Sequence, residues 1–483
     1  MIRSLLCSVT MALTFAAGPA PAATIDHGAA VVLETPPPPG PARELALPAV
    51  ETYALANGMM VTLVPFGTVP KVTLSLRVRA GWLDEDKPGV ADLMTDLMNE
   101  GAAGLSPADL ARRAGGMGGG IGVSGGRESV SAGIDVLSEH AADAVALLAD
   151  VIRRPDLPAS ELPRLRQDML RGLAIARTSP SSMAGDAFAK AFLPGHPFGR
   201  GNLEPAQVEA VTIDDIRRFH AEKLGAARAH LYVAGQFDAA AVRRAIEAAF
   251  GDWQGGPPPR LRPPLPNDKL KLVLVDRPGA VQSTLIVAAP LPAADYPDRV
   301  TMTVADELLG GAFTSRITLN LREDKGYTYS PGSSVSYGLR YGAWTLSADV
   351  TAAHTGDSLT EIFKEIDRLA HEAPPAAELN GKQNSIAGSW VLRTATRSGI
   401  VGGLSFYDIQ GLPRDELGAY LGKVRGVTPA DVSRVIGAYL RPERMTVVVV
   451  GDLKSVTPQL ARVSRLKNAL PGRQVERKRG EPQ

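Results

Sequence analysis

The chain has 483 residues, a formal net charge of +1 at pH 7 and a hydrophobic content of 45%. This length accommodates several domains at ~150 residues each. The balanced charge argues against a nucleic-acid-binding protein and against binding to an anionic membrane surface, since both require a basic excess.

The first 23 residues have the pattern of a cleaved secretory signal peptide. Arg3 supplies a positive charge, residues 5–17 form an apolar core, and Pro21-Ala22-Ala23 provide small residues for cleavage. The single cysteine, Cys7, lies inside this segment, so we expect a mature chain without disulfides or a thiol nucleophile. No later run approaches the ~20 apolar residues of a membrane span. We therefore expect a bacterial protein that is periplasmic or secreted.

Residues 24–49, which contain E-T-P-P-P-P-G-P, are predicted to be an extended leader. A first half, residues 50–254, then begins with a predicted hairpin at 53–64, whose turn is Asn57-Gly58. Residues 71–80 alternate between apolar and polar side chains, which predicts a strand with one polar face.

The next segment predicts an amphipathic helix that begins at Gly89. Its apolar side comprises Val90, Ala91, Leu93, Met94, Leu97 and Met98, and its polar stripe comprises Asp92, Thr95, Asp96 and Asn99. Asp92 and Asp96, one turn apart, have the chemistry to hold a hard cation weakly. We favour the simpler interpretation, a solvated polar face.

Glycines are concentrated at residues 115–128, before a strand at 129–137. A phosphate-binding loop is excluded, because no Gly-Lys-Ser/Thr closes this segment and no helix is predicted to start there. A long helix is predicted at 161–178. Another, at 213–223, leads into a buried strand at 229–236.

A proline-rich linker, residues 255–269, precedes a second half at 270–468 that repeats the same plan. Strands are predicted at 270–275 and 284–289, and a helix begins near Asp298. A helix at 429–440 again leads into a buried strand, here at 445–452. A polar tail, residues 469–483, ends the chain.

Two segments resemble the insulinase/pitrilysin (M16) family of peptidases. One is R-A-G-W-L-D-E-D-K-P-G-V-A-D-L-M-T-D-L-M-N-E-G-A-A-G-L at 79–105. The other is L-L-G-G-A-F-T-S-R-I-T-L-N-L-R-E-D-K-G-Y-T-Y-S at 308–330. The resemblance implies an α+β fold of the M16 and LuxS metalloenzyme type. It further implies two homologous halves facing across a cleft, each built from two related sandwich-like domains with antiparallel-rich sheets and helices.

The family's zinc site has no counterpart in this sequence. The family pattern H-x-x-E-H aligns with Asp92, Thr95 and Asp96, and the position of the third ligand, a glutamate, aligns with Gly172. Zinc of this type needs two imidazoles and a carboxylate that activates water. The resemblance therefore implies a peptidase fold that binds no metal itself, with Asp92, Thr95, Asp96 and Gly172 as degenerate ligand and base positions.

The second segment retains a family signature. Arg322 and Tyr329 align with an Arg/Tyr pair that, in active members, reaches across the cleft to hold the substrate backbone and the oxyanion. The resemblance implies this substrate-supporting role here. The structural alternative is an arginine paired with a core carboxylate and a tyrosine that caps a strand.

The chain lacks the zinc ligands and retains the Arg/Tyr pair. In this combination it resembles the non-catalytic subunit of two-subunit M16 peptidases. This implies a zinc-bearing sister subunit as partner and peptides as substrates. One alternative is a non-hydrolytic peptide- or protein-binding module on the same fold. Another, an autonomous peptidase using Ser124, Ser129 or Ser131, is disfavoured because no histidine stands in a recognisable relation to these serines. A neighbouring reading frame encoding H-x-x-E-H would distinguish the first two.

Overall fold

The structure, a computed structural model, describes residues 48–258 and 262–470. The signal peptide at 1–23, nearly all of the leader and nearly all of the polar tail lie outside these residues, so their assignments stay predictions. Within the described residues, no helix combines the length and the apolar character required to cross a membrane.

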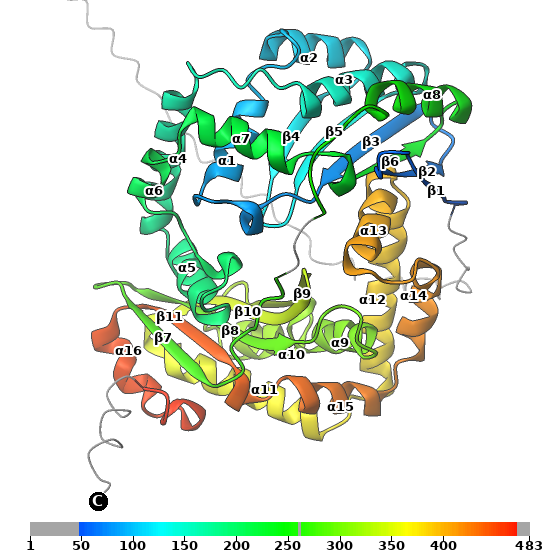
Figure 1. Ribbon diagram of the computed structural model, residues 1–483. Coiled ribbons are helices and arrows are strands. Elements are labelled where there is room, and N and C mark those ends of the chain that lie inside the picture. Colours follow the sequence, from blue (N-terminus) through cyan, green and yellow to red (C-terminus); the bar gives the residue numbers. More distant parts are fainter. Residues whose placement is uncertain (1–47, 259–261, 471–483) are drawn as a thin grey trace, which may run out of the picture. The chain divides into compact units, whose positions relative to one another are not determined.

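The first sheet has six strands in the order β1-β2-β6-β3-β5-β4 (Figure 1). The β2–β6 pair is parallel and the other neighbours are antiparallel. The predicted hairpin is confirmed, with Gly58 at its turn in a left-handed conformation (φ +88°). The strands are β1 (Glu51–Ala54), β2 (Met60–Pro65), β3 (Lys71–Val78), β4 (Ile121–Gly125), β5 (Val130–Leu137) and β6 (Ala229–Gly235).

The second sheet has five strands in the order β7-β11-β8-β10-β9. Its single parallel pair, β7–β11, occupies the place that β2–β6 takes in the first sheet. The predicted internal repeat is therefore present in the topology, and β1 is the only addition among the described strands. The strands are β7 (Lys271–Asp276), β8 (Gln282–Leu291), β9 (Gly332–Gly338), β10 (Tyr341–Thr351) and β11 (Thr446–Gly451).

The prediction of two domains in each half is wrong. The described chain consists of two domains with one sheet each, which together equal a single half of the expected architecture. The physical reason lies in the segments between β5 and β6 and between β10 and β11, which are helical and supply no further strands. Without strands of their own, these segments cannot build a second sheet and must bury their apolar faces elsewhere.

Helices cover one face of each sheet. On the first sheet they are α1 (Val90–Met98), α3 (Ala141–Arg153), α7 (Ile213–Lys223) and α8 (Ala239–Phe250), which share one apolar core with the inward residues of β3. On the second they are α9 (Arg299–Asp306), α11 (Thr355–His371), α15 (Pro429–Tyr439) and α16 (Leu453–Leu460). The other helices are α2 (Pro107–Gly116), α4 (Leu162–Thr178), α5 (Pro180–Phe192), α6 (Pro205–Glu209), α10 (Arg316–Thr318), α12 (Ala376–Thr394), α13 (Arg397–Gln410) and α14 (Asp415–Gly426).

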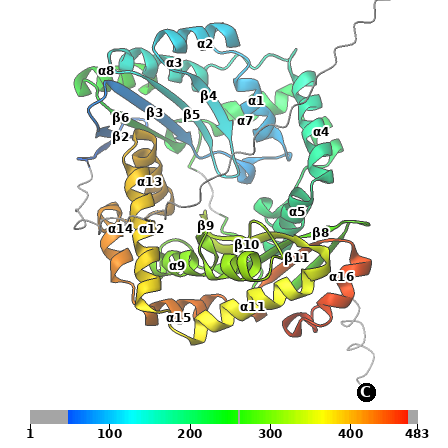
Figure 2. The same cartoon turned by 180° about the vertical axis from the view of Figure 1, so that it is seen from behind.

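The two domains exchange one helix each. Helix α5 follows the first domain's α4 in sequence but packs on the second sheet, where Ala184 contacts the cluster of Ile286 and Val448. Helix α13, which belongs in sequence to the second domain, packs on the first sheet (Figure 2). There Ile400 and Leu404 share an apolar cluster with Tyr232 and Val64 of the strands. Separating the domains would expose both apolar clusters to water, so the exchange favours one cooperative unit.

A polar network ties α13 to the first sheet. Tyr232 on β6 donates to Asp408 at 2.7 Å, and Arg414 Nε donates to the same carboxylate at 2.6 Å. His230 belongs to this network, with Nε2 2.8 Å from Thr62 Oγ1 and its ring stacked on Tyr232. Burial lowers the pKa of His230 to about 4, although Asp408 opposes the shift.

We expect the stability of the protein to fall as the pH drops from 6.5 towards 4. The unfolded chain protonates His230 near pH 6.5, whereas the folded chain keeps it neutral to about 4, so protons favour unfolding between these values. The full effect is up to roughly 3 kcal/mol. His230→Gln should flatten this part of the stability–pH profile in urea unfolding. His371→Gln, at an exposed site on α11, is the control. An unchanged slope in His230→Gln would contradict the assignment.

Candidate functional site

The four degenerate positions lie on two helices that pack together, α1 and α4. Helix α1 starts after Gly89, whose left-handed backbone (φ +95°) turns the chain into the helix. The six residues of its predicted apolar side are all buried, as expected. This packing fixes the rotation of α1 and therefore the direction in which Asp92, Thr95 and Asp96 project.

Asp92 is held by neighbouring side chains. Arg200 Nη2 donates to Asp92 Oδ2 at 3.1 Å, and Trp82 Nε1 donates to Oδ1 at 3.3 Å. The guanidinium of Arg200 lies over the Trp82 ring, 3.9 Å from its centroid, and also pairs with Glu85. We call Trp82, Glu85, Asp92 and Arg200 the Arg200 cluster. A guanidinium thus neutralises the carboxylate at the position that the predicted alignment assigns to the family's first zinc ligand.

Glu85 is the most deeply buried acid of the Arg200 cluster, with a side chain only 2% exposed. Its second oxygen accepts a hydrogen bond from the backbone of Ala91 at 2.8 Å, near the start of α1. Burial raises the pKa of the Glu85 carboxyl, and the nearby Arg200 opposes that shift. The cluster therefore fastens α1 to the loop that carries Arg200.

Thr95 does not lie on a solvated face, as the sequence predicted, but is buried with 3% exposure. Its hydroxyl donates to the carbonyl of Asp92 at 2.8 Å, and it faces Gly125 at the end of β4. A Cβ at Gly125 would stand 2.7 Å from the Thr95 oxygen, so the glycine permits this close approach. Thr95 is short, its hydroxyl is hydrogen-bonded within its own helix, and it fills a space next to the sheet edge.

Asp96 and Gly172 are exposed. Desolvation, and then the charges of Asp92 and Glu100, raise the pKa of Asp96. A Cβ at Gly172 would meet no atom within 4 Å, so the position has room but supplies no ligand. The residues present do not fit a zinc ion, because they offer no imidazole and a cationic guanidinium occupies the site. No cluster of metal-ligating side chains is found in residues 48–258 and 262–470.

The structure brings Arg322 and Tyr329 together. Arg322 lies on the π-helical turn η6 (Leu319–Asp324), and its guanidinium stands 4.8 Å from the centroid of the Tyr329 ring. The same guanidinium stands 4.3 Å from the centroid of the Phe313 ring, its second aromatic partner. Arg322 Nε pairs with the exposed Glu323 at 3.1 Å, and not with a core carboxylate. The substrate-supporting role of the pair stays a prediction.

These aromatic partners are unusually open to solvent. Tyr329 is 78% exposed and Phe313 is 70% exposed. Stacking restricts the orientation of the Arg322 guanidinium, whose side chain is half-buried, while Tyr329 stays open to solvent. Phe313 and three members of the Arg200 cluster, Trp82, Glu85 and Arg200, were missed from the sequence. Phe313 follows the Gly310-Gly311 pair without any distinguishing local pattern, and Glu85 and Arg200 are 115 positions apart.

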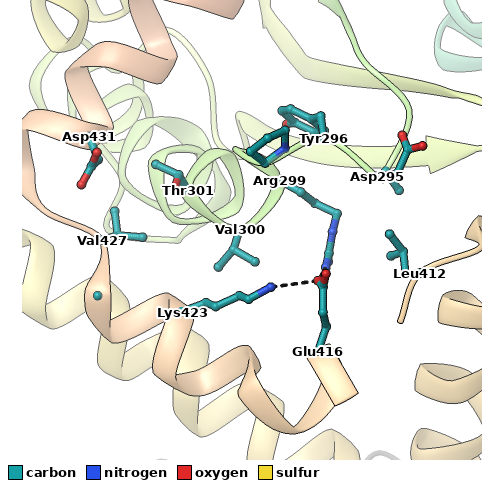
Figure 3. Close-up of a pocket in the computed structure, with 13 residues that line it drawn as sticks. Asp295, Tyr296, Arg299, Val300, Thr301, Leu412, Glu416, Lys423, Val427 and Asp431 are labelled. Carbon is teal, nitrogen blue, oxygen red and sulfur yellow. Dashed lines mark hydrogen bonds and ion pairs between the residues drawn. The ribbon is translucent and has the colours of Figure 1, made fainter. Parts of the chain in front are cut away.

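A pocket of about 350 Å³ lies among α9, α14 and α15. Figure 3 shows Arg299 and Lys423 converging on the carboxylate of Glu416, with both nitrogen–oxygen distances 3.0 Å. The charges of Arg299, Lys423 and Glu416 are thus paired with one another within the pocket. We assign it a structural role.

Comparison with known proteins relates both domains to one family. Residues 63–206 match the family profile described as Insulinase (Peptidase family M16), and residues 210–386 match the one described as Peptidase M16 inactive domain. A protein of Mycobacterium leprae named an uncharacterized zinc protease is 25% identical over 70% of this chain and 77% of its own length.

Two solved structures share the fold. The peptidase M16 inactive domain from Pseudomonas fluorescens has a TM-score of 0.77 and 24% identity, covering 83% of this chain and 98% of that one. A chain of Complex III2 from Candida albicans has a TM-score of 0.71 and 15% identity, covering 85% and 99% respectively.

Proposed function

Because the chain belongs to the insulinase (M16) family of peptidases, we propose that it is the non-catalytic subunit of a heterodimeric zinc peptidase in the bacterial periplasm. A zinc-bearing sister subunit would cleave peptides, and this chain would close the chamber and contribute Arg322 and Tyr329. The observation that carries the proposal is the pairing of Asp92 with Arg200 where the family has its first ligand. That arrangement removes metal chemistry from this chain without disturbing α1 or α4.

The stacking of Arg322 on the exposed Tyr329 supports the second part of the proposal. A guanidinium and a phenol side by side donate to a peptide carbonyl and to the oxyanion that forms during hydrolysis. The chain itself supplies binding, orientation and charge stabilisation, while its own residues provide no nucleophile or activated water.

The test compares the mature chain alone, the sister subunit alone and the two together. We expect the chain alone to lack stoichiometric zinc and to leave peptides intact, since Asp92, Asp96 and Gly172 cannot form a tetrahedral site. Added to the sister subunit, it should raise peptide turnover. About one zinc per purified chain, lost in Asp92→Ala, would overturn the proposal.

A second candidate function is a non-hydrolytic module that binds peptides or proteins. Its support is the similarity of fold to a chain of Complex III2. It differs from the first candidate in one measurable way, because a binding module would capture its ligand without accelerating hydrolysis by any zinc-bearing partner.

A further inference from the structure

On the face of the first sheet that points away from its helices, the outward residues of β3 are polar. Along β3 the even-numbered residues from Val72 to Val78 enter the core, so Ser75 and Arg77 lie on the opposite face. Directly across from Arg77 are Ser131 on β5 and His230 on β6. Helix α13 packs on part of this face (Figure 1). The chain thus places the positive charge of Arg77 between two neutral cross-strand neighbours.

A cavity of about 210 Å³ opens beside the end of β3. Its walls include Arg77, Arg79, His230, Tyr232 and Asp408, and the last of these comes from α13. The cavity is therefore built by both domains, with arginines from the first and the end of an exchanged helix from the second. Its volume suits a small polar group with a few carbon atoms rather than a whole peptide.

Arg77 and Arg79 are half-buried, and their surroundings differ from those of the neighbouring Arg228. No ion pair or side-chain hydrogen bond reaches either guanidinium from any residue that the structure describes. Arg228, which lines the same cavity, is by contrast paired with Asp84 at 2.6 Å. The pocket of Figure 3 shows the usual solution, in which each cation has a carboxylate in contact.

Two carboxylates near the arginines, Asp408 and Glu128, make hydrogen bonds elsewhere, although the charge of Glu128 still acts on both arginines. Asp408 accepts from Arg414 at 2.6 and 2.7 Å and from Tyr232 at 2.7 Å. Glu128 accepts from the backbone of Leu339 at 2.7 Å. Burial lowers the pKa of Arg79, and the charge of Glu128 opposes that shift. Two adjacent guanidinium groups without acceptors in a concave site have the donor geometry that holds a carboxylate.

We propose that Arg77 and Arg79 form a subsite for a peptide carboxylate, either the C-terminal carboxylate or the side chain of Glu or Asp. The inference rests on the proposed function, since it assumes that peptides enter between the domains. Carboxylate is the anion that peptides carry, and the forked donors of two arginines match its two oxygens. Occupancy would anchor the peptide at a point on the first sheet remote in sequence from Arg322.

The experiment measures peptide binding to the intact mature chain by calorimetry at fixed ionic strength. Three synthetic peptides share one sequence without acidic residues. The first ends in a free carboxylate, the second in an amide, and the third in an amide with one glutamate introduced. We expect the second peptide, which has no carboxylate, to bind roughly tenfold more weakly than the first, which has a free C-terminal carboxylate. Tight binding of the third peptide would identify side-chain carboxylates as a source.

The double variant Arg77→Gln/Arg79→Gln should bring all three affinities to the level of the amidated peptide. Arg113→Gln/Arg244→Gln removes the same charge at exposed positions outside the cavity and should leave the preference intact. Equal affinities of the wild-type chain for all three peptides would overturn the subsite and leave peptide binding standing. No binding of any peptide would overturn the subsite, while the proposed function would still be decided by the two-subunit assay. The wild-type comparison requires no variant to fold.

Discussion

Tyr329→Phe is expected to lower peptide turnover by the two-subunit enzyme by on the order of 10²–10³-fold, the usual effect of losing one oxyanion donor. The substitution removes a single hydroxyl and keeps the ring that stacks on Arg322. Because Tyr329 is 78% exposed, folding should be unaffected. A fall in kcat with little change in KM would indicate a contact made mainly in the transition state.

Two substitutions of Arg322 are tested in the same assay as Tyr329→Phe. Arg322→Ala should lower turnover to a similar degree, and Arg322→Lys should restore little, because an ammonium lacks the planar fork that stacks between Phe313 and Tyr329. Tyr53→Phe is the matched control, since its hydroxyl has no hydrogen-bond partner in the described structure and lies on β1. Unchanged kinetics in the Arg322 and Tyr329 variants, with the heterodimer intact, would favour the binding-module function.

The second large effect is a gain of metal. Asp92→His, Thr95→Glu, Asp96→His and Gly172→Glu together replace every ligand and base position of the family. Position 172 has room, since a Cβ there meets nothing within 4 Å. We expect these four changes to be insufficient for zinc binding as long as Arg200 remains. Two unit charges about 4 Å apart repel by roughly 4 kcal/mol at an effective dielectric constant of 20, and zinc carries two charges.

Arg200 and Glu85 should therefore be replaced as a pair. Removing Arg200 alone would leave Glu85 buried without its partner, which costs roughly 3 kcal/mol or more of stability. With Arg200→Gln and Glu85→Gln added to the four ligand substitutions, we expect about one zinc per chain after dialysis, measured by elemental analysis. The pair Arg200→Gln/Glu85→Gln without new ligands is the control and should stay metal-free.

Two results would contradict this account. Equal zinc in the backgrounds with and without Arg200 would show that the guanidinium does not oppose the metal. If the variant with all six substitutions folds but binds no zinc, α1 and α4 do not present positions 92, 96 and 172 to a common point. The alignment with the family pattern would then be wrong.

Local chemistry in the sequence determined the secondary structure of the site. The Asn57-Gly58 turn, the alternation along β3 and the apolar stripe of α1 each depend on neighbours within a few residues, and each is present as expected. The motif context also placed Arg322 and Tyr329 side by side. The number of domains was overestimated, because an apolar helix pattern does not state which sheet the helix will cover.

Only the tertiary structure decided how the charges are paired and which domain covers which sheet. Asp92 and Arg200 are 108 positions apart, and Tyr232 and Asp408 are 176 apart, so no local pattern links them. Thr95 is buried because Gly125, on a separate strand, has no side chain to keep it away. Asp408 lines the same cavity as Arg77 and Arg79, yet it pairs with Arg414 across 6 positions of the chain. Such pairings are set by distances that exist only after the exchanged helices bury their apolar faces.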